Sequence, residues 1–197
     1  MPVAMLPIVA DDELTPRLAE VLRSSRLSHG LSTAALAEAS GVSRASIVKL
    51  ERAESQPSAA LLGRLCPPLG LTLSELFARV ERPREDSGRL LRAGQAPVWT
   101  DPASGYRRVS RSPLAGGPLQ LTEIELPPGA SITYPADAYR DIHQQVWVLA
   151  GDLELVEDGR RHELGAGDCL ELGPAADCTF TNHRDRTTRY LVAVARR

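Results

Sequence analysis

Polar and basic side chains that can contact nucleic acid gather in the first third of the chain. The guanidinium of Arg44 can bond the O6 and N7 atoms of guanine together, a contact that discriminates between bases by about 1–3 kcal/mol. Lys49 and Arg52 follow at helical spacing and suit phosphates, which set affinity and its salt dependence. Ser32 and Thr33 can hold a phosphate if they open a helix, since hydroxyl and N–H groups are exposed there.

The pattern between residues 14 and 77 predicts helices that would position these side chains. Apolar residues recur there at intervals of three and four. Ser32 is suited to cap one short helix and Ser43 the next, and Gly41 lies between them, where a helix ends with positive φ. Two short helices joined by a glycine turn indicate a helix-turn-helix. The second helix would then present at its start Ser43, Arg44, Ala45 and Ser46.

Three strings in this region, LAEVLRSSRLSHGLS, LAEASGVSRASIVKLERAESQPS and LTLSELF, resemble the phage-repressor-like helix-turn-helix family, also called the XRE family. The resemblance implies a lambda-repressor-like domain of five helices that binds a two-fold DNA operator as a dimer, with its third helix in the major groove. It also implies an internal ion pair between Arg23 and Glu51. The chain departs from the family at Thr33, which is usually glutamine. It departs again at Pro67 and Pro68, which predict that the fourth helix ends near Leu65. An ordinary helical bundle with solvated basic residues is the alternative.

Composition excludes several broad classes. The chain has 197 residues and a net charge of −2, and 43% of its residues are hydrophobic, which is typical of a globular protein of one or two domains. Neither a membrane helix nor a signal peptide is expected, because no apolar run is long enough and the first residues lack a basic segment. The chain has three cysteines, an odd number, and they are widely spaced: Cys66, Cys169 and Cys178. This argues against a disulfide framework and favours a cytoplasmic location.

The second half of the chain has the period of β-strands. From about Leu119 apolar residues alternate with polar ones, and turn signals interrupt them every eight to fifteen residues, which predicts an antiparallel sandwich or small barrel. The expected divisions are a tail (1–12), a helix-turn-helix domain (13–80), a linker rich in charge, Pro and Gly (81–97) and a β domain (98–197). Residues 13–82 carry nine Arg and Lys against seven Asp and Glu (net +2), and residues 98–197 carry eleven against fourteen (net −3), which gives a weak indication that only the helical half meets nucleic acid.

The segment HQQVWVLAGDLELVEDGRRHELGAGDCLELGPAADCTFTN resembles a cupin barrel over about residues 110–195. Many cupins hold Fe, Mn or Zn with three histidines and a glutamate. Gln144 occupies the glutamate position here, Cys178 occupies that of the later histidine, and residues 138–140 contain no histidine. His143 would point away from the pocket because neighbours on a strand face opposite sides. We therefore predict no metal, no cofactor and no catalytic residue.

A pocket without a metal is the remaining expectation for the barrel. The parity of Gln144 directs inward Ala138, Arg140, Ile142, Val146 and Val148, with Cys178 and Phe180 opposite. The candidate effector pocket is Arg140, Gln144, Val146, Cys178 and Phe180, with Arg140 suited to a carboxylate. Alternatively the barrel is filled by its own side chains and serves dimerisation. Cys178 is a buried thiol or a redox sensor, and Trp147 lies on the outward face, in sheet packing or at a dimer interface.

These patterns together predict a DNA-binding transcriptional regulator, acting as a cytoplasmic homodimer on double-stranded operator DNA, with a barrel that senses a small-molecule effector. We expect no membrane partner. One alternative is a metal-dependent cupin enzyme, an isomerase or a dioxygenase, with an accessory helix-turn-helix. Another is an antitoxin-like partner protein. RNA binding is not indicated, since no aromatic platform is apparent.

Overall fold

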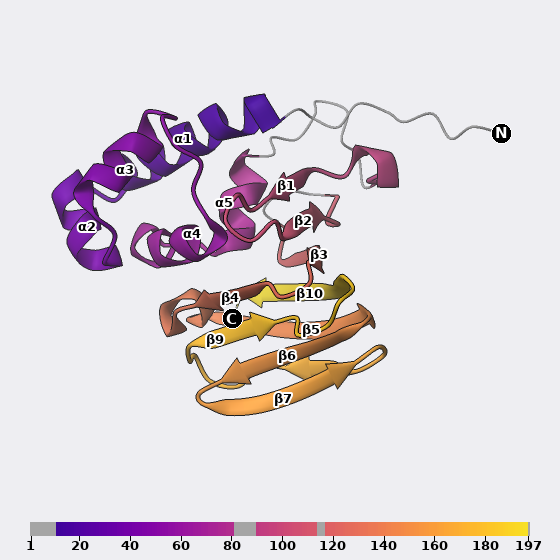
Figure 1. Cartoon of the computed structure of the whole chain (residues 1–197). Coiled ribbons are helices and arrows are strands. Elements are labelled where there is room, and N and C mark those ends of the chain that lie inside the picture. The colour runs from indigo at the N-terminus through magenta and orange to yellow at the C-terminus, as the bar shows by residue number, and fades with distance from the viewer. Residues whose placement is uncertain (1–10, 81–89, 114–116, 197) are drawn as a thin grey trace.

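The computed structural model describes residues 11–80, 90–113 and 117–196, with side chains from Leu14 onward. Helices fill the first part and strands the second, and the two parts pack against each other (Figure 1). In the described residues no helix is long and apolar enough to cross a membrane.

Five α-helices form the first part, as predicted. Their interior is aliphatic, with Leu18, Leu36, Ile47 and Leu62 almost completely buried. The fourth helix ends at Leu65, as predicted, because the prolines that follow cannot donate the next helical hydrogen bonds. The helices are α1 (Asp11–Ser28), α2 (Thr33–Ser40), α3 (Arg44–Glu51), α4 (Ala59–Leu65) and α5 (Leu73–Val80), with a 3-10 turn at Pro67–Leu69 between the last two.

Two antiparallel sheets form the second part and face each other. One sheet has the strand order β1-β2-β3-β10-β5-β8, and the other has the order β4-β9-β6-β7. The rings of Phe180 and Tyr190 stack between the sheets, with centroids 5.9 Å apart. The strands are β1 (Val98–Thr100), β2 (Arg107–Ser110), β3 (Leu119–Leu126), β4 (Ser131–Tyr134), β5 (Ile142–Ala150), β6 (Asp152–Glu157), β7 (Arg160–Gly165), β8 (Cys169–Glu171), β9 (Cys178–Thr181) and β10 (Thr188–Arg196).

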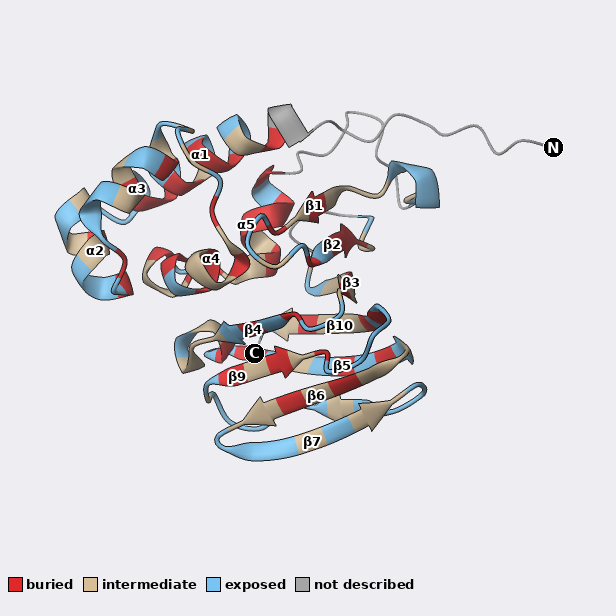
Figure 2. Cartoon of the chain, viewed as in Figure 1, coloured by how far each residue is buried: buried red, intermediate tan, exposed pale blue. Residues whose placement is uncertain are grey.

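Strand β5 shows the predicted alternation. Val146 and Val148 are fully buried between the sheets, whereas Trp147 is 48% exposed on the outer side. Figure 2 shows the same alternation of buried and exposed segments along the barrel strands. The parity assigned from the sequence is therefore confirmed along this strand, because the pleat sends successive side chains to opposite faces.

The helices and the barrel share one hydrophobic core. Phe77 of α5 packs on Trp99 of β1, with ring centroids 5.0 Å apart, and Trp99 packs edge-on against Tyr106. The buried carboxylate of Asp101 accepts the backbone N–H of Ala59 at the start of α4 (3.0 Å). These contacts fix how the two parts sit together.

The linker predicted at 81–97 joins the two parts. Residues 81–89 lie outside the described residues. Residues 90–97 lead through a 3-10 turn at Ala93–Gln95 into β1, and the described residues of the two parts share one hydrophobic core.

Candidate nucleic-acid interface and interdomain cavity

The turn between α2 and α3 is built by local hydrogen bonds, as the sequence predicted. Ser32 accepts the N–H of Ala35 (3.0 Å), and Ser43 accepts the N–H of Ser46 (3.1 Å), so both helices begin with a side-chain cap. Gly41 has φ 64° between them, a conformation that costs glycine no steric strain. The start of α3 is thereby fixed by residues that lie within a few positions of one another.

The predicted DNA-contacting side chains lie on the accessible surface of the helical part. Arg44 donates through Nε to Thr33 Oγ1 (3.2 Å), which joins the starts of α2 and α3. Lys49 is exposed further along α3, while Arg52 follows the end of the helix and lies 3.8 Å from the Glu54 carboxylate. The exposed or half-buried members of this surface are Ser32, Thr33, Ser43, Arg44, Ala45, Ser46, Lys49 and Arg52.

The predicted ion pair between Arg23 and Glu51 is wrong in one partner. Arg26 donates to both carboxylate oxygens of Glu51, at 2.6 and 2.8 Å, and also to the carbonyl of Leu31. Both paired side chains are 9% exposed, whereas Arg23 is exposed. Since Arg26 lies about one helical turn after Arg23, the way α1 lies against α3 decides which of the two meets Glu51.

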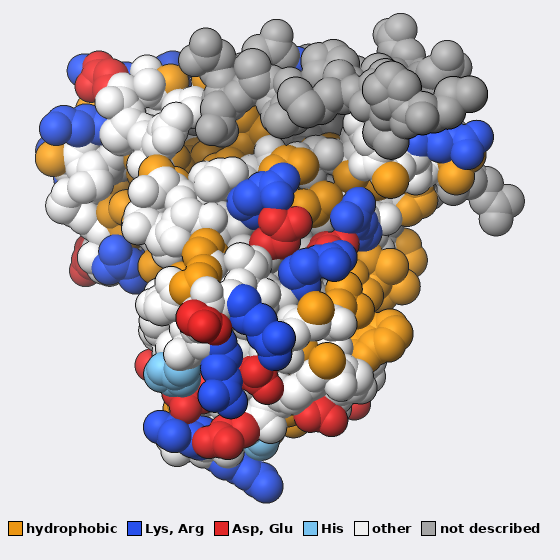
Figure 3. Space-filling view, turned by 45° about the vertical axis from the view of Figure 1, so that its right-hand side comes forward, with side chains coloured by type: hydrophobic (Ala, Val, Ile, Leu, Met, Phe, Trp, Pro, Cys, Tyr) orange, Lys and Arg blue, Asp and Glu red, His pale blue; other side chains and the backbone are white. Residues whose placement is uncertain are grey.

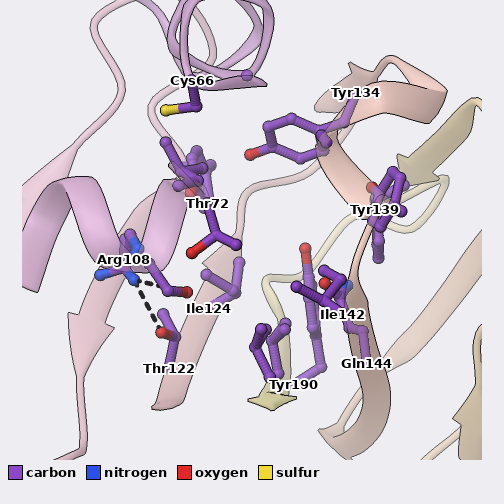
Figure 4. Close-up of a pocket in the computed structure, with 18 residues that line it drawn as sticks. Cys66, Thr72, Arg108, Thr122, Ile124, Tyr134, Tyr139, Ile142, Gln144 and Tyr190 are labelled. Carbon is purple, nitrogen blue, oxygen red and sulfur yellow. Dashed lines mark hydrogen bonds between the residues drawn. The ribbon is translucent and has the colours of Figure 1, made fainter. Parts of the chain in front are cut away.

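A cavity of about 80 Å³ lies where the helical part meets the barrel (Figure 4). Figure 4 shows Cys66, Thr72 and Arg108 on one side of it, and Tyr134, Tyr139 and Tyr190 around the other. The helical part contributes Gly63, Cys66, Thr72, Leu73 and Ser74. The barrel contributes Tyr106, Arg108, Thr122, Ile124, Tyr134, Ala138, Tyr139, Ile142, Gln144, Phe180, Tyr190, Val192 and Val194.

All four tyrosines of the chain line this cavity. Burial raises the pKa of each phenol, so all four remain protonated at neutral pH: Tyr106, Tyr134, Tyr139 and Tyr190. The phenols of Tyr106 and Tyr134 lie near each other, and the phenol of Tyr139 lies near the Cys178 thiol. The cavity therefore combines apolar ring faces with neutral O–H groups.

Arg108 is the charged residue among the described residues that line the cavity, and it is only 4% exposed. Its guanidinium donates to the hydroxyls of Ser110 (3.1 Å), Ser74 (3.2 Å) and Thr122 (3.0 Å). Its Cζ atom lies 4.6 Å from the centroid of the Phe77 ring. Because Ser74 and Phe77 belong to α5, this side chain connects the barrel wall directly to the helical part.

The predicted effector pocket coincides with this cavity only in part. Gln144 and Phe180 line it, but Val146 does not, although it is fully buried. Arg140 is exposed and pairs with Asp137 outside the cavity. It follows the 3-10 turn Ala136–Tyr139 and precedes β5, so strand parity does not apply to it.

Cys178 also differs from its predicted place. It is buried against Tyr139 behind the cavity wall rather than exposed within the cavity. Burial raises the pKa of this thiol to about 11, and that of Cys66 to about 12. Both thiols are therefore protonated at neutral pH, the less nucleophilic form, whereas Cys169 lies exposed on β8.

An open groove adjoins the cavity and shares Thr72, Ala138 and Ile142 with it. The groove runs between the turn after α4 and the segment before β5, and it contains the exposed side chains of Arg140 and Arg196.

The residues present do not fit the metal site of metal-binding cupins. In the part of the chain that the structure describes, no three His, Cys, Asp or Glu side chains come close enough together to hold an ion. His143 points outward, as predicted, with 56% of its side chain exposed.

Comparison with known proteins supports both halves of this architecture. Residues 17–79 match the family model for a helix-turn-helix domain. A solved structure of an HTH_3 family transcriptional regulator from Vibrio cholerae has the same fold, with a TM-score of 0.76 and 24% identity over 95% of this chain and 99% of that one. No curated protein matches the chain in sequence.

Two other solved structures are similar at a lower level. One is the Cupin_2 domain of an XRE family transcriptional regulator from Enterobacter cloacae, with a TM-score of 0.38 and 18% identity over 41% of this chain and 83% of that one. The other is hydroxypropylphosphonic acid epoxidase from S. wedmorenis, with a TM-score of 0.45 and 16% identity over 92% of this chain and 97% of that one. Both scores are too low to indicate a function. The family model and the strand order define the architecture: the chain joins a helix-turn-helix domain to a β-domain of two facing antiparallel sheets.

Proposed function

We propose that this protein is a transcriptional regulator that binds a two-fold DNA operator as a homodimer and responds to a small-molecule effector. The exposed start of α3 is the observation that carries the proposal. Arg44 and Thr33 lie there beside two serine caps, and Lys49 lies further along α3. A helix presented in this way can place its first residues against base edges and its later basic residues near phosphates.

The outer face of the larger sheet supports the homodimer. Register places seven apolar residues on this face, which we call the outer β-face: Leu119, Leu121, Trp147, Leu149, Leu191, Ala193 and Ala195. Trp147 and Leu119 are 48% and 51% exposed. Figure 3 shows hydrophobic side chains on the barrel surface beside acidic and basic ones. A contiguous apolar face with charges of both signs around it suits a self-complementary contact with a second copy.

The interdomain cavity supports the response to an effector. Its lining comes from α4, α5 and both sheets of the barrel, so a bound molecule would contact the helical part and the barrel together. A ligand can change DNA affinity only if it favours one arrangement of these parts over another. A cavity at the junction meets that condition better than one enclosed by the barrel alone.

The test of DNA binding is to recover and sequence the genomic fragments that the purified protein binds at near-physiological salt. We expect fragments that share a two-fold motif. Salt-sensitive binding with no shared motif would contradict operator recognition by the protein alone.

The dimer is tested by sedimentation. Trp147→Glu should produce monomers, whereas Leu27→Glu, a change at a similarly exposed residue on α1, should not. A Trp147→Glu variant that remains dimeric would refute the outer β-face as the interface.

A further inference from the structure

Two polar side chains of the barrel face the cavity without a protein partner. Among the residues that the structure describes, neither the side-chain amide of Gln144 nor the hydroxyl of Tyr190 has a hydrogen-bond partner, and both side chains line the cavity. Figure 4 shows them directed toward the cavity from β5 and β10. Polar groups inside a protein are normally hydrogen-bonded, to the protein or to a bound molecule. These two groups are therefore available to a ligand.

The charged side chain in the cavity wall is engaged in the junction. Arg108 donates to the hydroxyls of Ser110, Ser74 and Thr122, and these are not its only contacts. We therefore assign its guanidinium no part in binding. No Asp or Glu is found among the described residues that line the cavity. A charged ligand would lose its hydration without gaining a free group of opposite charge, which is costly, so the cavity favours an uncharged ligand.

The chemistry of the two available groups selects the polar end of the ligand. The amide of Gln144 offers both N–H donors and a carbonyl acceptor. The phenol of Tyr190 keeps its proton because burial raises its pKa well above the usual value, so it too can donate and accept. A ligand hydroxyl matches both groups because it donates as well as accepts. An ether oxygen only accepts, and it would leave the carbonyl of Gln144 unpaired.

The rest of the lining and the size of the cavity select the body of the ligand. Ile124, Ile142 and Val192 of the barrel and Leu73 of the helical part add aliphatic surface to that of the aromatic rings. One water needs about 10–15 Å³ by this kind of measure, and a cavity of about 150 Å³ holds benzene. The volume of about 80 Å³ therefore suits an aliphatic molecule of roughly three to six non-hydrogen atoms.

We propose that the interdomain cavity binds a small uncharged alcohol, with its hydroxyl at Gln144 and Tyr190 and its aliphatic body against the tyrosine rings and the helical part. This inference names the ligand class of the sensing function proposed above and rests on that function for its biological meaning. The binding itself is measured without DNA.

The test is an NMR titration of the full-length protein with 1-propanol, 1-butanol and 1-pentanol, and with butyrate, butylammonium and diethyl ether, an isomer of 1-butanol. We expect at least one of the three alcohols to bind saturably, with one site per chain. The two ions should bind at least tenfold more weakly than the best alcohol, and the ether several-fold more weakly than 1-butanol. The proposal is overturned if no alcohol binds saturably, if either ion binds as tightly as the best alcohol, or if the ether matches 1-butanol.

Matched variants locate the site. Tyr190→Phe removes the hydroxyl but keeps the ring that stacks on Phe180, and Gln144→Leu removes the amide; each should weaken binding of the alcohol several-fold. Gln145→Leu makes the same change at the next residue of β5, which is exposed, and should leave binding unchanged. Equal losses in Gln144→Leu and Gln145→Leu, or unchanged binding in both cavity variants, would refute the assignment.

A second measurement separates this inference from the proposed function. The affinity for the recovered DNA motif is measured with and without a saturating concentration of the alcohol. A changed affinity that is lost in Tyr190→Phe at the same alcohol concentration supports both ideas. Saturable binding that leaves DNA affinity unchanged would refute sensing through this site while the ligand assignment stands.

Discussion

The two ends of the helical domain face different surroundings. At the α2–α3 end, the polar side chains are exposed and their local hydrogen bonds are completed within the helix pair. At the α4–α5 end, apolar residues and serine hydroxyls are buried against the barrel, and Ser74 and Phe77 both contact Arg108 of β2. The first end makes these hydrogen bonds within the helices, whereas the second end makes its contacts with the barrel.

The two ends are nevertheless connected through α1. Helix α5 packs on α1, with Arg79 donating to Ser25 (3.4 Å), and α1 is tied to α3 by the pair between Arg26 and Glu51. Each link is a packed or ion-paired contact between helices. We therefore predict that a shift of α5 at the cavity would be passed through α1 to the α2–α3 end.

Loss of the Arg26–Glu51 pair should have the largest effect. Arg26→Ala leaves the Glu51 carboxylate buried without its partner, and removing one member of a buried pair costs about 3–5 kcal/mol in the free energy of unfolding. Arg23→Ala, the matched control on the exposed side of the same helix, should change it by less than about 0.5 kcal/mol. Urea denaturation measures both, and equal effects would show that Arg23 contributes to the core of the domain.

At the α2–α3 end, two variants should separate the specificity of the proposed DNA binding from its affinity. Arg44→Ala should reduce the preference for the operator over random DNA by about 1–3 kcal/mol. Lys49→Ala should weaken binding to both DNAs alike and lower the salt slope by about one. Binding titrations on the two DNAs at several salt concentrations test this. Parallel losses in the two variants would contradict the roles assigned to them.

At the α4–α5 end, Gly63→Ala should destabilise the fold by forcing the Tyr134 ring out of its place in the cavity wall. A Cβ atom at Gly63 would lie 2.5 Å from Cδ1 of Tyr134, so the ring must move. Overpacking of this kind costs about 1–3 kcal/mol, measured by urea denaturation. In the double variant with Tyr134→Ala, the cost of Gly63→Ala should largely vanish; additive effects would mean that the ring is not the obstacle.

The ion pair between Glu75 and Arg196 should have a smaller effect, and one that depends on pH. Arg196 donates to both oxygens of the Glu75 carboxylate across the junction. Burial alone would raise the pKa of Glu75, but hydrogen bonds from Arg196 and Thr72 outweigh it and lower the pKa. The native pKa is then below the unfolded value of about 4.3, so the pair stabilises the fold above that pH and loses its effect as the pH falls through the native pKa.

Glu75→Gln should therefore reduce stability at neutral pH by up to about 1 kcal/mol, since the pair is partly exposed. The difference from wild type should narrow in acid. Thermal unfolding between pH 3 and pH 7 measures it, and a gap that stays constant over this range would exclude a contribution from ionised Glu75.

The last prediction concerns the order in which the three cysteines react with a thiol reagent, and it involves no change in stability. Cys169 is exposed and should react first with a thiol reagent at pH 7. Cys66 and Cys178 should react far more slowly, because burial both blocks access and raises the pKa of their thiols. Mass spectrometry of the labelled protein gives the order. Early labelling of Cys178 would restore the redox-sensing role considered for it.

The sequence predicted which side of a helix or strand each residue faces. It did not predict at which residue the helix or strand begins. Strand parity was correct for Val146, Trp147 and His143 because they lie on one continuous strand. It failed for Arg140 because Asp141, with φ 63°, interrupts the chain just before the strand begins. The ion pair was displaced from Arg23 to Arg26 in a similar way, since the packing of α1 against α3 selects one of two adjacent turns.

The sequence by itself determined the helix-turn-helix, its caps, the end of α4 and the alternation along the strands. Each depends on residues within a few positions of one another, through φ preference, capping and the absence of a proline N–H. Only the tertiary structure decided the cavity. Its four tyrosines come from β4, β10, the segment before β2 and the turn before β5, and Ser74 comes from the other domain. Such a site is defined by contacts between distant residues, which no local pattern encodes.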